Sequence, residues 1–399
     1  MEVAVALEHR FSRTPDGKVW TESFFARSFW QRYLAVFEGV RPIARVKEVP
    51  AAQEGWKRVD GPGIRVTAMP YYVGPAEFLQ RRREITRAAE AAISPESAVI
   101  LRVSSQIANC LEPGLRRRRQ PFAVEVVADP YGVFAPGAIR HPLRPLLRWW
   151  FPRRLRRQCR AACGVSYVTR ETLQASYPPK AGAFHTHYSS VELGRECFAD
   201  APRPPRAGGP LRIVFVGTLE VYYKAPDTLL EALARCRRSG LDFLLSMVGD
   251  GRRRVDLERL AATLGIDRAV VFAGLLPAGA AIREQLDRAD LFVLPSRQEG
   301  LPRAMIEAMA RGLPCIGSTA GGIPELLAAE CMAPPGDAAA LADRILRAAR
   351  DPVWMAEMSR RNLEVASDYR DEILNERRKN FYRQLQGATN HWLKRAKPN

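Results

Sequence analysis

The feature that most constrains the fold of this chain is a regular alternation of short apolar runs with stretches of helical periodicity. The alternation is clearest from residue 211 onward. Strands that alternate with helices in this way predict βα units and a parallel sheet, so the fold class is α/β. The predicted strands are 211–216, 242–248, 269–272, 290–294 and 314–317, and the predicted helices are 226–238, 254–264, 302–311 and 337–350, with more helix beyond.

The N-terminal half shows the same alternation, with strands predicted at 3–7, 44–49, 64–68, 98–103, 122–127 and 164–169. Between the halves, residues 200–210 hold four prolines and two glycines, which is typical of an interdomain linker. A chain of 399 residues is long enough for two domains of about 100–200 residues each. The predicted divisions are an N-terminal domain at 1–200, a linker at 201–210, a C-terminal domain at 211–367 and a C-terminal helix at 368–399.

The formal net charge of +18 favours an anionic partner. Arg140–Arg160 mixes eight arginines with leucines, tryptophans and a phenylalanine, and Arg116–Arg119 adds four arginines upstream. A basic segment of this kind favours an anionic membrane surface. The alternatives are a solvated helix whose leucines and tryptophans pack inward, or stacking on single-stranded nucleic acid. Because no nucleic-acid-binding module accompanies the arginines, we expect no nucleic-acid partner.

The cysteines and histidines indicate neither disulfides nor a metal site. The seven cysteines are odd in number and contain no Cys-x-x-Cys pair, so reduced thiols are expected. Cys159 with Cys163, and His185 with His187, share faces of predicted elements, but no further ligand completes either set. We therefore expect no metal and no cofactor.

The sequence also bears on location. No apolar run approaches the roughly 18–20 residues that span a bilayer. Residues 1–7 are predicted to form a strand and carry no basic leader, so a cytoplasmic protein is expected.

Four candidate ligand-binding features follow one another in the C-terminal half, the first three at ends of predicted strands. Lys224 lies just before a predicted helix, where a point charge can meet a diphosphate beside free backbone amides. Glycines at strand ends let a backbone approach a ligand closely, and an aromatic ring can wall a base-binding slot. The residues concerned in the first three features are Gly217, Thr218, Lys224, Gly249, Gly251, Phe272 and Gly274.

The fourth and most specific feature is the segment 295–314. Glu299, Gly300 and Leu301 lie in the loop that leads into a helix predicted to start at Pro302, where free amides and the positive end of the helix dipole suit an anion. Glu307 lies just over one turn further on, within reach of a pair of hydroxyls. One short segment thus offers amides for a phosphate and two carboxylates for sugar hydroxyls.

At these residues the chain resembles the retaining GT-B glycosyltransferases of glycosyltransferase family 4. The resemblance rests on the spacing of Glu299 and Glu307, on the Val-Gly element that ends at Lys224, and on the Gly-Gly-Ile-Pro-Glu run that ends at Glu325, and it covers residues 211–349. It implies a GT-B architecture, in which two Rossmann-like domains face a cleft and a C-terminal helix within 368–385 crosses back to the N-terminal domain.

The resemblance also implies roles. Lys224 would neutralise the leaving diphosphate, Glu307 would hold the ribose, and Glu299 would hold the transferred sugar beside the amides of Gly300 and Leu301. The reaction expected of such an enzyme needs no metal, since the departing phosphate takes the proton of the acceptor hydroxyl.

The chain departs from the family pattern at two positions. Thr218 stands where relatives usually carry an arginine that binds phosphate, and Arg252 or Arg303 are the candidates to replace it. Asp129 stands where many relatives carry a histidine, so it is predicted to contact the sugar or the acceptor. The alternative for Asp129 is a turn-forming role before Pro130.

The predicted function is metal-independent, retaining transfer of a sugar from a nucleotide-sugar donor to a lipid-linked or polysaccharide-precursor acceptor. A polyprenyl-linked glycan is the expected acceptor, and the cytoplasmic face of the cell membrane is the expected location. One alternative is a sugar-nucleotide epimerase, or a transferase with a soluble acceptor. A second is a non-catalytic sugar-nucleotide-binding subunit, which the missing cation at Thr218 favours.

Overall fold

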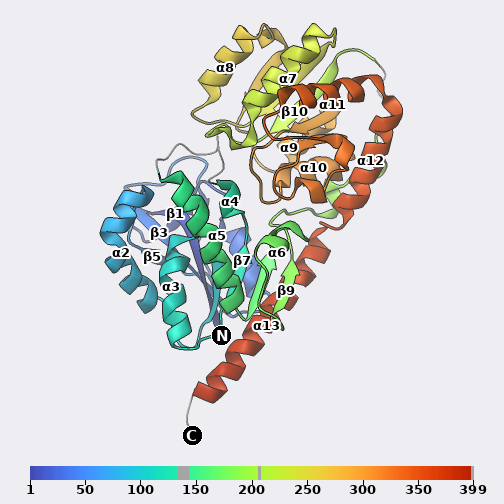
Figure 1. Ribbon diagram of the computed structural model, residues 1–399. Helices are drawn as coiled ribbons and strands as arrows, with labels where there is room; N and C mark the ends of the chain where they lie inside the picture. The colour runs from blue at the N-terminus through green and yellow to red at the C-terminus, as the bar shows by residue number, and fades with distance from the viewer. Residues whose placement is uncertain (134–142, 205–207, 397–399) are drawn as a thin grey trace. The chain divides into compact units, whose positions relative to one another are not determined.

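The computed structural model describes residues 1–133, 143–204 and 208–396 and divides into two compact units (Figure 1). The first unit comprises Met1–Ala128, Phe151–Tyr188 and Asn375–Asn399, and the second comprises Asp129–Trp150 and Ser189–Leu374. Residues 189–200 thus group with the second unit, although the composition of the chain placed the end of the first domain at 200.

The first unit is built on a nine-stranded sheet in which every pairing is parallel except those of β2 with β1 and β4. The order is β4-β2-β1-β6-β7-β8-β9, and β3 pairs with both β1 and β5. Every residue of β6 is buried, as expected of a parallel strand covered on both faces. The strands are β1 (Glu2–Arg13), β2 (Val19–Thr21), β3 (Gly39–Glu48), β4 (Lys57–Arg58), β5 (Thr67–Met69), β6 (Ala98–Val103), β7 (Ala123–Val126), β8 (Gly164–Tyr167) and β9 (Phe184–His187).

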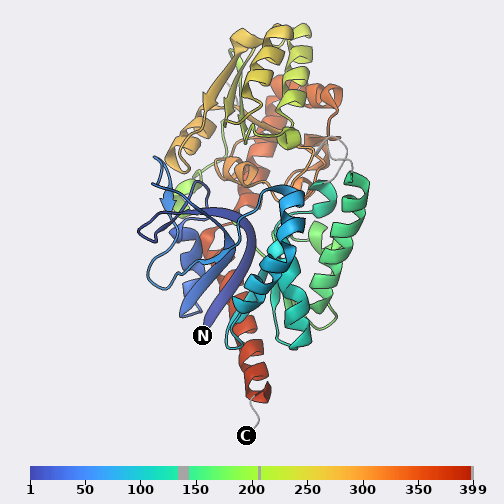
Figure 2. The ribbon, with the colours of Figure 1, turned by 90° about the vertical axis from the view of Figure 1, so that its left-hand side faces the viewer.

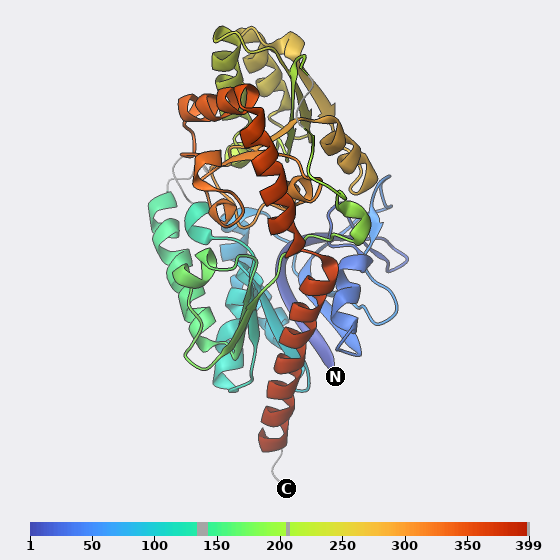
Figure 3. The same ribbon diagram turned by 90° about the vertical axis from the view of Figure 1, so that its right-hand side faces the viewer.

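Helices α2, α3 and α5 lie on one side of this sheet (Figures 1 and 2). Their apolar residues, among them Ile85, Ile107 and Leu155, pack with strand residues such as Leu101 and Val124 into one core. Helix α13 runs along the same unit with Phe381 and Tyr382 buried (Figure 3). The helices are α1 (Arg27–Leu34), α2 (Gly74–Ala91), α3 (Gln106–Arg117), α5 (Arg144–Ala161), α6 (Thr172–Ser176) and α13 (Asp371–Ala396), while α4 (Pro130–Val133) and residues 144–150 of α5 group with the second unit.

A buried carboxylate ties α13 to the sheet. Glu125 on β7 accepts hydrogen bonds from the guanidinium of its register partner Arg102 at 2.6 Å and from the hydroxyls of Tyr188 at 2.9 Å, Tyr33 at 3.2 Å and Tyr382 at 3.4 Å. Because a buried charge is tolerated only when it is paired and hydrogen-bonded, this network fixes the place of the helix that carries Tyr382.

The second unit is built on a six-stranded parallel sheet in the order β12-β11-β10-β13-β14-β15. The strands are β10 (Leu211–Val216), β11 (Phe243–Val248), β12 (Val270–Gly274), β13 (Leu291–Leu294), β14 (Cys315–Ser318) and β15 (Met332–Ala333), and the helices are α7 (Pro226–Arg238), α8 (Arg254–Thr263), α9 (Ala280–Arg288), α10 (Arg303–Ala310), α11 (Ala338–Arg350) and α12 (Pro352–Ser367). The α/β class and the parallel sheets are confirmed. Helix α9 and strand β15 were not predicted, and Pro302 is the N-cap of α10 rather than its first helical residue.

The expected thiol state also holds, since all seven cysteines are free and all but Cys163 are buried. Along the described ranges, no helix combines the length and the apolar character that a bilayer crossing requires.

Candidate functional site

The strand order of the second unit reverses direction at β10 and β13. From β10 the chain builds outward through β11 and β12, then returns to β13 on the other side and continues to β14 and β15. At such a switch point the loops after the two strands diverge, and ligands of open α/β sheets bind there, beyond the carboxyl ends of the strands. The loops concerned are 217–225 after β10 and 295–302 after β13.

These two loops place a lysine against a glutamate. Lys224 Nζ lies 2.5 Å from Glu299 Oε1, and the same oxygen accepts a hydrogen bond from Ser296 Oγ at 2.7 Å. Glu299 is 8% exposed and Lys224 closes a short 3₁₀ turn over Tyr222–Lys224. The next residue, Ala225, has φ +54°, a left-handed conformation that is costly for alanine and turns the chain into α7. A cation and a carboxylate, predicted separately, therefore meet at one point.

A second ion pair, which the sequence did not reveal, holds the two loops together. Both terminal nitrogens of Arg297 bind Asp227, at 2.7 and 2.9 Å, and Arg297 also donates to the backbone oxygen of Tyr222 at 3.0 Å. The amide of Arg297 donates to the backbone oxygen of Tyr223 at 2.8 Å. A bidentate pair of this kind fixes geometry as well as adding energy. Because Tyr222, Tyr223 and Asp227 flank Lys224 in the sequence, their contacts with Arg297 also hold Lys224 in place.

Glycines at the ends of the strands let the backbones of neighbouring loops approach one another closely. A Cβ atom on Gly249 would lie 1.8 Å from the oxygen of Gly217, and one on Gly251 would lie 2.2 Å from the nitrogen of Glu220. The Gly249 amide also donates to the oxygen of Gly274 at 2.8 Å. The loops after β10, β11 and β12 therefore interlock through atoms that only glycine leaves room for.

The Gly-Gly-Ile-Pro-Glu run likewise brings its backbone close to that of the loop that carries Glu299. Gly321 has φ +55°, and a Cβ atom there would lie 2.2 Å from the oxygen of Glu299. The amide of Gly322 donates to the oxygen of Gly300 at 2.8 Å. This run supports the segment that presents Glu299, Gly300 and Leu301 at the start of α10, where no side chain caps the helix.

Glu307 lies on α10, and burial raises the pKa of its carboxyl above the usual range, with the charges of Arg303 and Arg283 acting in the opposite direction. Phe272 and Gly274 end β12, and Arg254 donates to the oxygen of Phe272 at 3.4 Å.

The two departures from the family pattern have local explanations. Thr218 Oγ1 accepts a hydrogen bond from the amide of Glu220 at 3.2 Å, and Glu220 in turn forms an ion pair with Arg252. Arg252 is thus tied to Glu220. Asp129 follows β7, and its Oδ1 accepts from the amide of Tyr131 at 2.9 Å, the turn-forming geometry. Contact of Asp129 with a sugar or acceptor stays a prediction.

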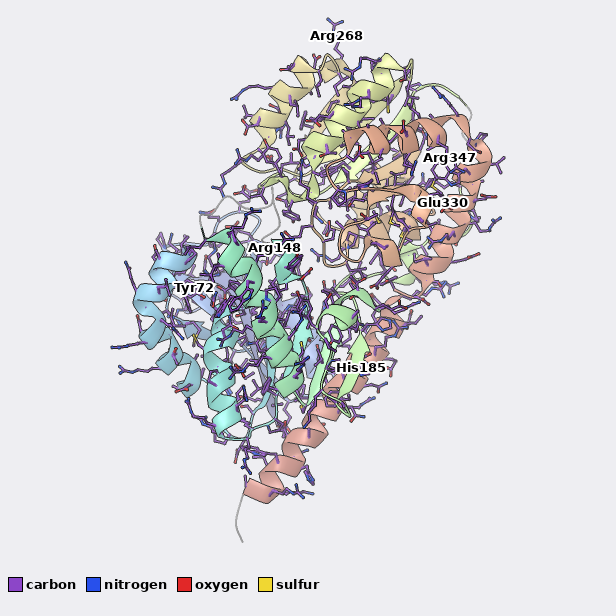
Figure 4. The ribbon with its side chains drawn as sticks, in the orientation of Figure 1. Tyr72, Arg148, His185, Arg268, Glu330 and Arg347 are labelled. Carbon is purple, nitrogen blue, oxygen red and sulfur yellow. The ribbon has the colours of Figure 1, made fainter. Side chains whose placement is uncertain are left out.

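His185 and His187, the histidine pair noted in the sequence, have different surroundings. His185 is exposed on β9 (Figure 4), and His187 Nε2 lies 3.0 Å from the guanidinium of Arg377. Within the described ranges, no three histidine, cysteine or acidic side chains come close enough to hold a metal ion.

Comparison with known proteins matches this site to a family. The family model described as glycosyl transferases group 1 matches residues 210–351, which span the whole sheet of the second unit. Protein CapJ of Staphylococcus aureus is 24% identical over 360 residues, 90% of this chain and 85% of that relative. The matched part of the chain, residues 210–351, is a domain of the group 1 glycosyltransferases. The amylovoran biosynthesis glycosyltransferase AmsK of Erwinia amylovora is 37% identical over 147 residues, which are 35% of this chain and 36% of AmsK.

Among solved structures, the chain is similar to sucrose-phosphate synthase of Thermosynechococcus elongatus, with a TM-score of 0.71 and 18% identity over 97% of this chain and all of that one. At that identity the likeness shows the fold alone. Together with the two parallel-sheet units, it confirms the predicted GT-B fold.

Proposed function

We propose that this glycosyltransferase is a retaining, metal-independent enzyme of family 4 that moves a sugar from a nucleotide-sugar donor to a lipid-linked or polysaccharide-precursor acceptor. The observation that carries the proposal is the contact of Lys224 with Glu299 at the switch point of the second sheet. AmsK, a relative by sequence, acts in the biosynthesis of a polysaccharide by its name, which supports a glycan acceptor.

In the proposed reaction the diphosphate of the donor lies beside Lys224 and the uncapped start of α10. Lys224 is the only lysine between residues 189 and 374, in a chain where arginine supplies nearly all other positive charge. Its compact ammonium can turn from Glu299 to a phosphate oxygen without leaving its turn. Negative charge grows on the leaving diphosphate as the glycosidic bond breaks, so a fixed cation there lowers the barrier. Glu299 is then released to accept hydrogen bonds from the sugar.

Glu307 would accept hydrogen bonds from the two ribose hydroxyls, which requires its ionised form. The amides of Gly300 and Leu301 would bind a phosphate oxygen, and the departing phosphate would take the proton of the acceptor hydroxyl. Positioning and electrostatics then carry the reaction, with no protein nucleophile and no metal.

The first unit would supply the acceptor site. A cavity of about 420 Å³ lies toward the carboxyl end of β1, with Glu8, Thr21, Ser23 and Arg45 among its polar lining residues. Glu8 is held there by the hydroxyl of Tyr72 at 2.7 Å and by Arg45 at 3.0 Å. Carboxylates and hydroxyls in a cavity are suited to the hydroxyl groups of a glycan.

Helix α5 would hold the enzyme at the cytoplasmic face of the membrane. Leu143, Leu146 and Trp149 recur at every third position and are 54%, 55% and 52% exposed. Further along, Leu155 is buried while Arg153 and Arg156 are exposed. Part of the aliphatic and aromatic content therefore faces outward beside arginines, as interfacial helices require. Arg140 and the two residues after it lie outside the described residues.

The transfer proposal is tested with a panel of sugar nucleotides and a membrane extract as the acceptor pool. The Lys224→Ala variant should lose transfer by roughly 10²–10³-fold, the usual cost of removing a charge-stabilising group, and Lys224→Arg should recover part of it. Arg268→Ala and Glu330→Gln, exposed changes in the same unit (Figure 4), are the matched controls. Unchanged transfer in Lys224→Ala would refute the site.

Further measurements separate the alternatives. The anomeric configuration of the product, read by NMR, tests retention, and full activity after treatment with a chelator tests metal independence. Conversion of the donor sugar without any acceptor would instead indicate an epimerase. Tight nucleotide binding without turnover on any acceptor would indicate a non-catalytic subunit.

The membrane role is tested separately by flotation with anionic vesicles. Leu146→Gln with Trp149→Gln, and in a second protein Arg153→Gln with Arg156→Gln, should each reduce binding. Arg154 is left intact because its guanidinium binds Asn109 of α3 through Nε at 2.6 Å and lies 3.8 Å from Glu112, so it holds α5 in place. Flotation equal to that of the unaltered protein in both variants would refute α5 as the attachment.

A further inference from the structure

A basic pocket lies at the amino-terminal ends of strands in the first sheet. The ligand-binding loops of such sheets follow the opposite, carboxyl-terminal ends of the strands. Its volume is about 550 Å³, and its walls come from the segments that precede β7, β8 and β9. Four cationic side chains line it, Arg116, Arg119, Arg160 and Lys180, and its lining includes no acidic residue. None of these residues takes part in the proposed transfer reaction.

The positive charge of the pocket is only partly balanced. Arg116 lies 3.3 Å from Glu112, a carboxylate that also has Arg154 and Arg157 within 3.8 Å. Arg119, Arg160 and Lys180 are exposed, and among the described residues no ion pair involves them.

The ends of two helices account for some of this charge. Helix α3 ends at Arg117 and α5 ends at Ala161, and each carbonyl end carries about half a negative charge that attracts cations. Two such ends and the shared carboxylate of Glu112 still leave an excess of about two positive charges among the four side chains. An excess of this size, gathered around one pocket, favours the binding of an anion.

A buried glutamine supports the wall of the pocket. Gln120 is 2% exposed, and its Nε2 is directed at the backbone oxygens of Ser94, Pro95 and Ser97, at 3.3, 3.4 and 3.1 Å. Its Oε1 is buried and accepts no hydrogen bond from the described part of the chain. Because this oxygen has no surface that a ligand could touch, the cationic side chains carry the recognition.

The thiol at the pocket is inert. Cys163 donates its hydrogen to the oxygen of Phe122 at 3.2 Å, and burial raises the pKa of the thiol to about 12. A thiol that stays protonated is neither a nucleophile nor a metal ligand at neutral pH. The chemistry available at the pocket is therefore binding.

We propose that this pocket binds a phosphate group, as in phosphoglycerol, which meets the exposed side chains of Arg119, Arg160 and Lys180. The phosphoglycerol can belong to a lipid headgroup or to a soluble ester. Arg160 lies in the last turn of α5, whose exposed arginines are proposed to face lipid, so a headgroup would reach the pocket along that helix.

The test uses the whole chain without donor or acceptor, so its outcome does not depend on transfer activity. The pocket variant combines Arg119→Asn, Arg160→Gln and Lys180→Gln; asparagine is chosen at 119 because that residue has φ +50°. The matched control removes three exposed charges from α2 of the same unit, by Arg82→Gln, Arg83→Gln and Arg87→Gln. Circular dichroism checks that both fold, and Arg119→Asn alone is the fallback.

Two arms identify the source of the phosphate. Glycerol 1-phosphate and inorganic phosphate are titrated by calorimetry, and vesicles of phosphatidylglycerol are compared with phosphatidylserine vesicles of equal charge. The unaltered protein and the control should bind phosphoglycerol, and the pocket variant should bind it roughly tenfold or more weakly. A loss confined to phosphatidylglycerol vesicles assigns the lipid, and a loss confined to glycerol 1-phosphate assigns the soluble ester. Equal binding by pocket variant and control, or no binding of any probe by the unaltered protein, would overturn the proposal.

Discussion

Acidification should destabilise the first unit through one residue, His9 on β1. Its ring lies 4.6 Å from that of Phe11 and 4.8 Å from that of Phe25, measured between centroids, and its Nε2 lies 3.0 Å from Thr21 Oγ1. Burial, with the charges of Arg45 and Arg10, lowers the pKa of His9 from 6.5 to about 4. The folded protein therefore holds this imidazole neutral at a pH where the unfolded chain protonates it.

The sign and size of the effect follow from proton linkage. A base whose pKa is lower in the folded state contributes stability above its unfolded pKa, and this stability is lost as the pH falls from about 6.5 toward 4. With these two values, the free energy of unfolding falls by about 2 kcal/mol between pH 7 and pH 5 from His9 alone. Acidic groups with ordinary pKa values contribute little in this interval.

The assay compares urea unfolding of the unaltered protein and of His9→Gln at pH 7 and pH 5. Glutamine keeps a hydrogen bond to Thr21 but cannot take up the proton, so the pH-dependent part of the difference belongs to His9. The variant should lose about 2 kcal/mol less than the unaltered protein over the interval. An equal loss in both proteins would refute this account, as would an NMR titration in which the His9 ring protonates near pH 6.5 in the folded state.

Three further changes probe the fold and the donor site. Glu125→Ala should lower the free energy of unfolding of the first unit by about 3–5 kcal/mol in urea denaturation, because Arg102 is left charged and buried, while Tyr382→Phe should cost only about 1 kcal/mol. Gly251→Ala should weaken nucleotide-sugar binding in calorimetry, because its Cβ atom forces the loop at Glu220 to move. Donor affinity should fall as the pH is lowered through the raised pKa of Glu307, beginning at a higher pH than for an ordinary glutamate, and Glu307→Gln should bind weakly without this pH dependence.

Each of these three predictions would be contradicted by a specific outcome. A Glu125→Ala protein as stable as the unaltered one would mean that the buried pair is dispensable. Unchanged nucleotide-sugar affinity in Gly251→Ala would show that the interlocking of loops does not shape the donor site. A pH dependence that persists in Glu307→Gln would assign the titration to another group.

The elements whose bounds were predicted well are those that begin or end at a glycine or a proline. Strand β10 and helix α7 have the predicted bounds, since Gly217 ends the strand and Pro226 begins the helix. Lys224 and Glu299 could be brought together in advance because parallel strands present their carboxyl ends at one edge. Strands β2, β4 and β15 were missed because two or three residues are too few for a period to show, and helix α9 was missed as well.

Other features depend on which strands become neighbours, and one sequence does not carry that information. The ion pair of Arg297 with Asp227 forms only because β13 lies next to β10. Glu125 reads as a polar residue in an apolar run, and nothing local indicates that Arg102 lies opposite it in the next strand. The same holds for Gly249, whose need for a glycine arises from the oxygen of Gly217 on a different loop.

The crossing of α13 has a consequence for the order in which the protein matures on the ribosome. All of the second unit is synthesised before Tyr382, yet the hydroxyl of this residue belongs to the buried network of the first unit. The unit that is made first therefore completes its core last, after some 190 residues of intervening chain, which at about 5–20 residues per second is a wait of roughly 10–40 seconds. During that wait the groove for α13 is open, and the buried faces of Phe37 and Tyr33 that meet Tyr382 are exposed to chaperones and to other nascent chains.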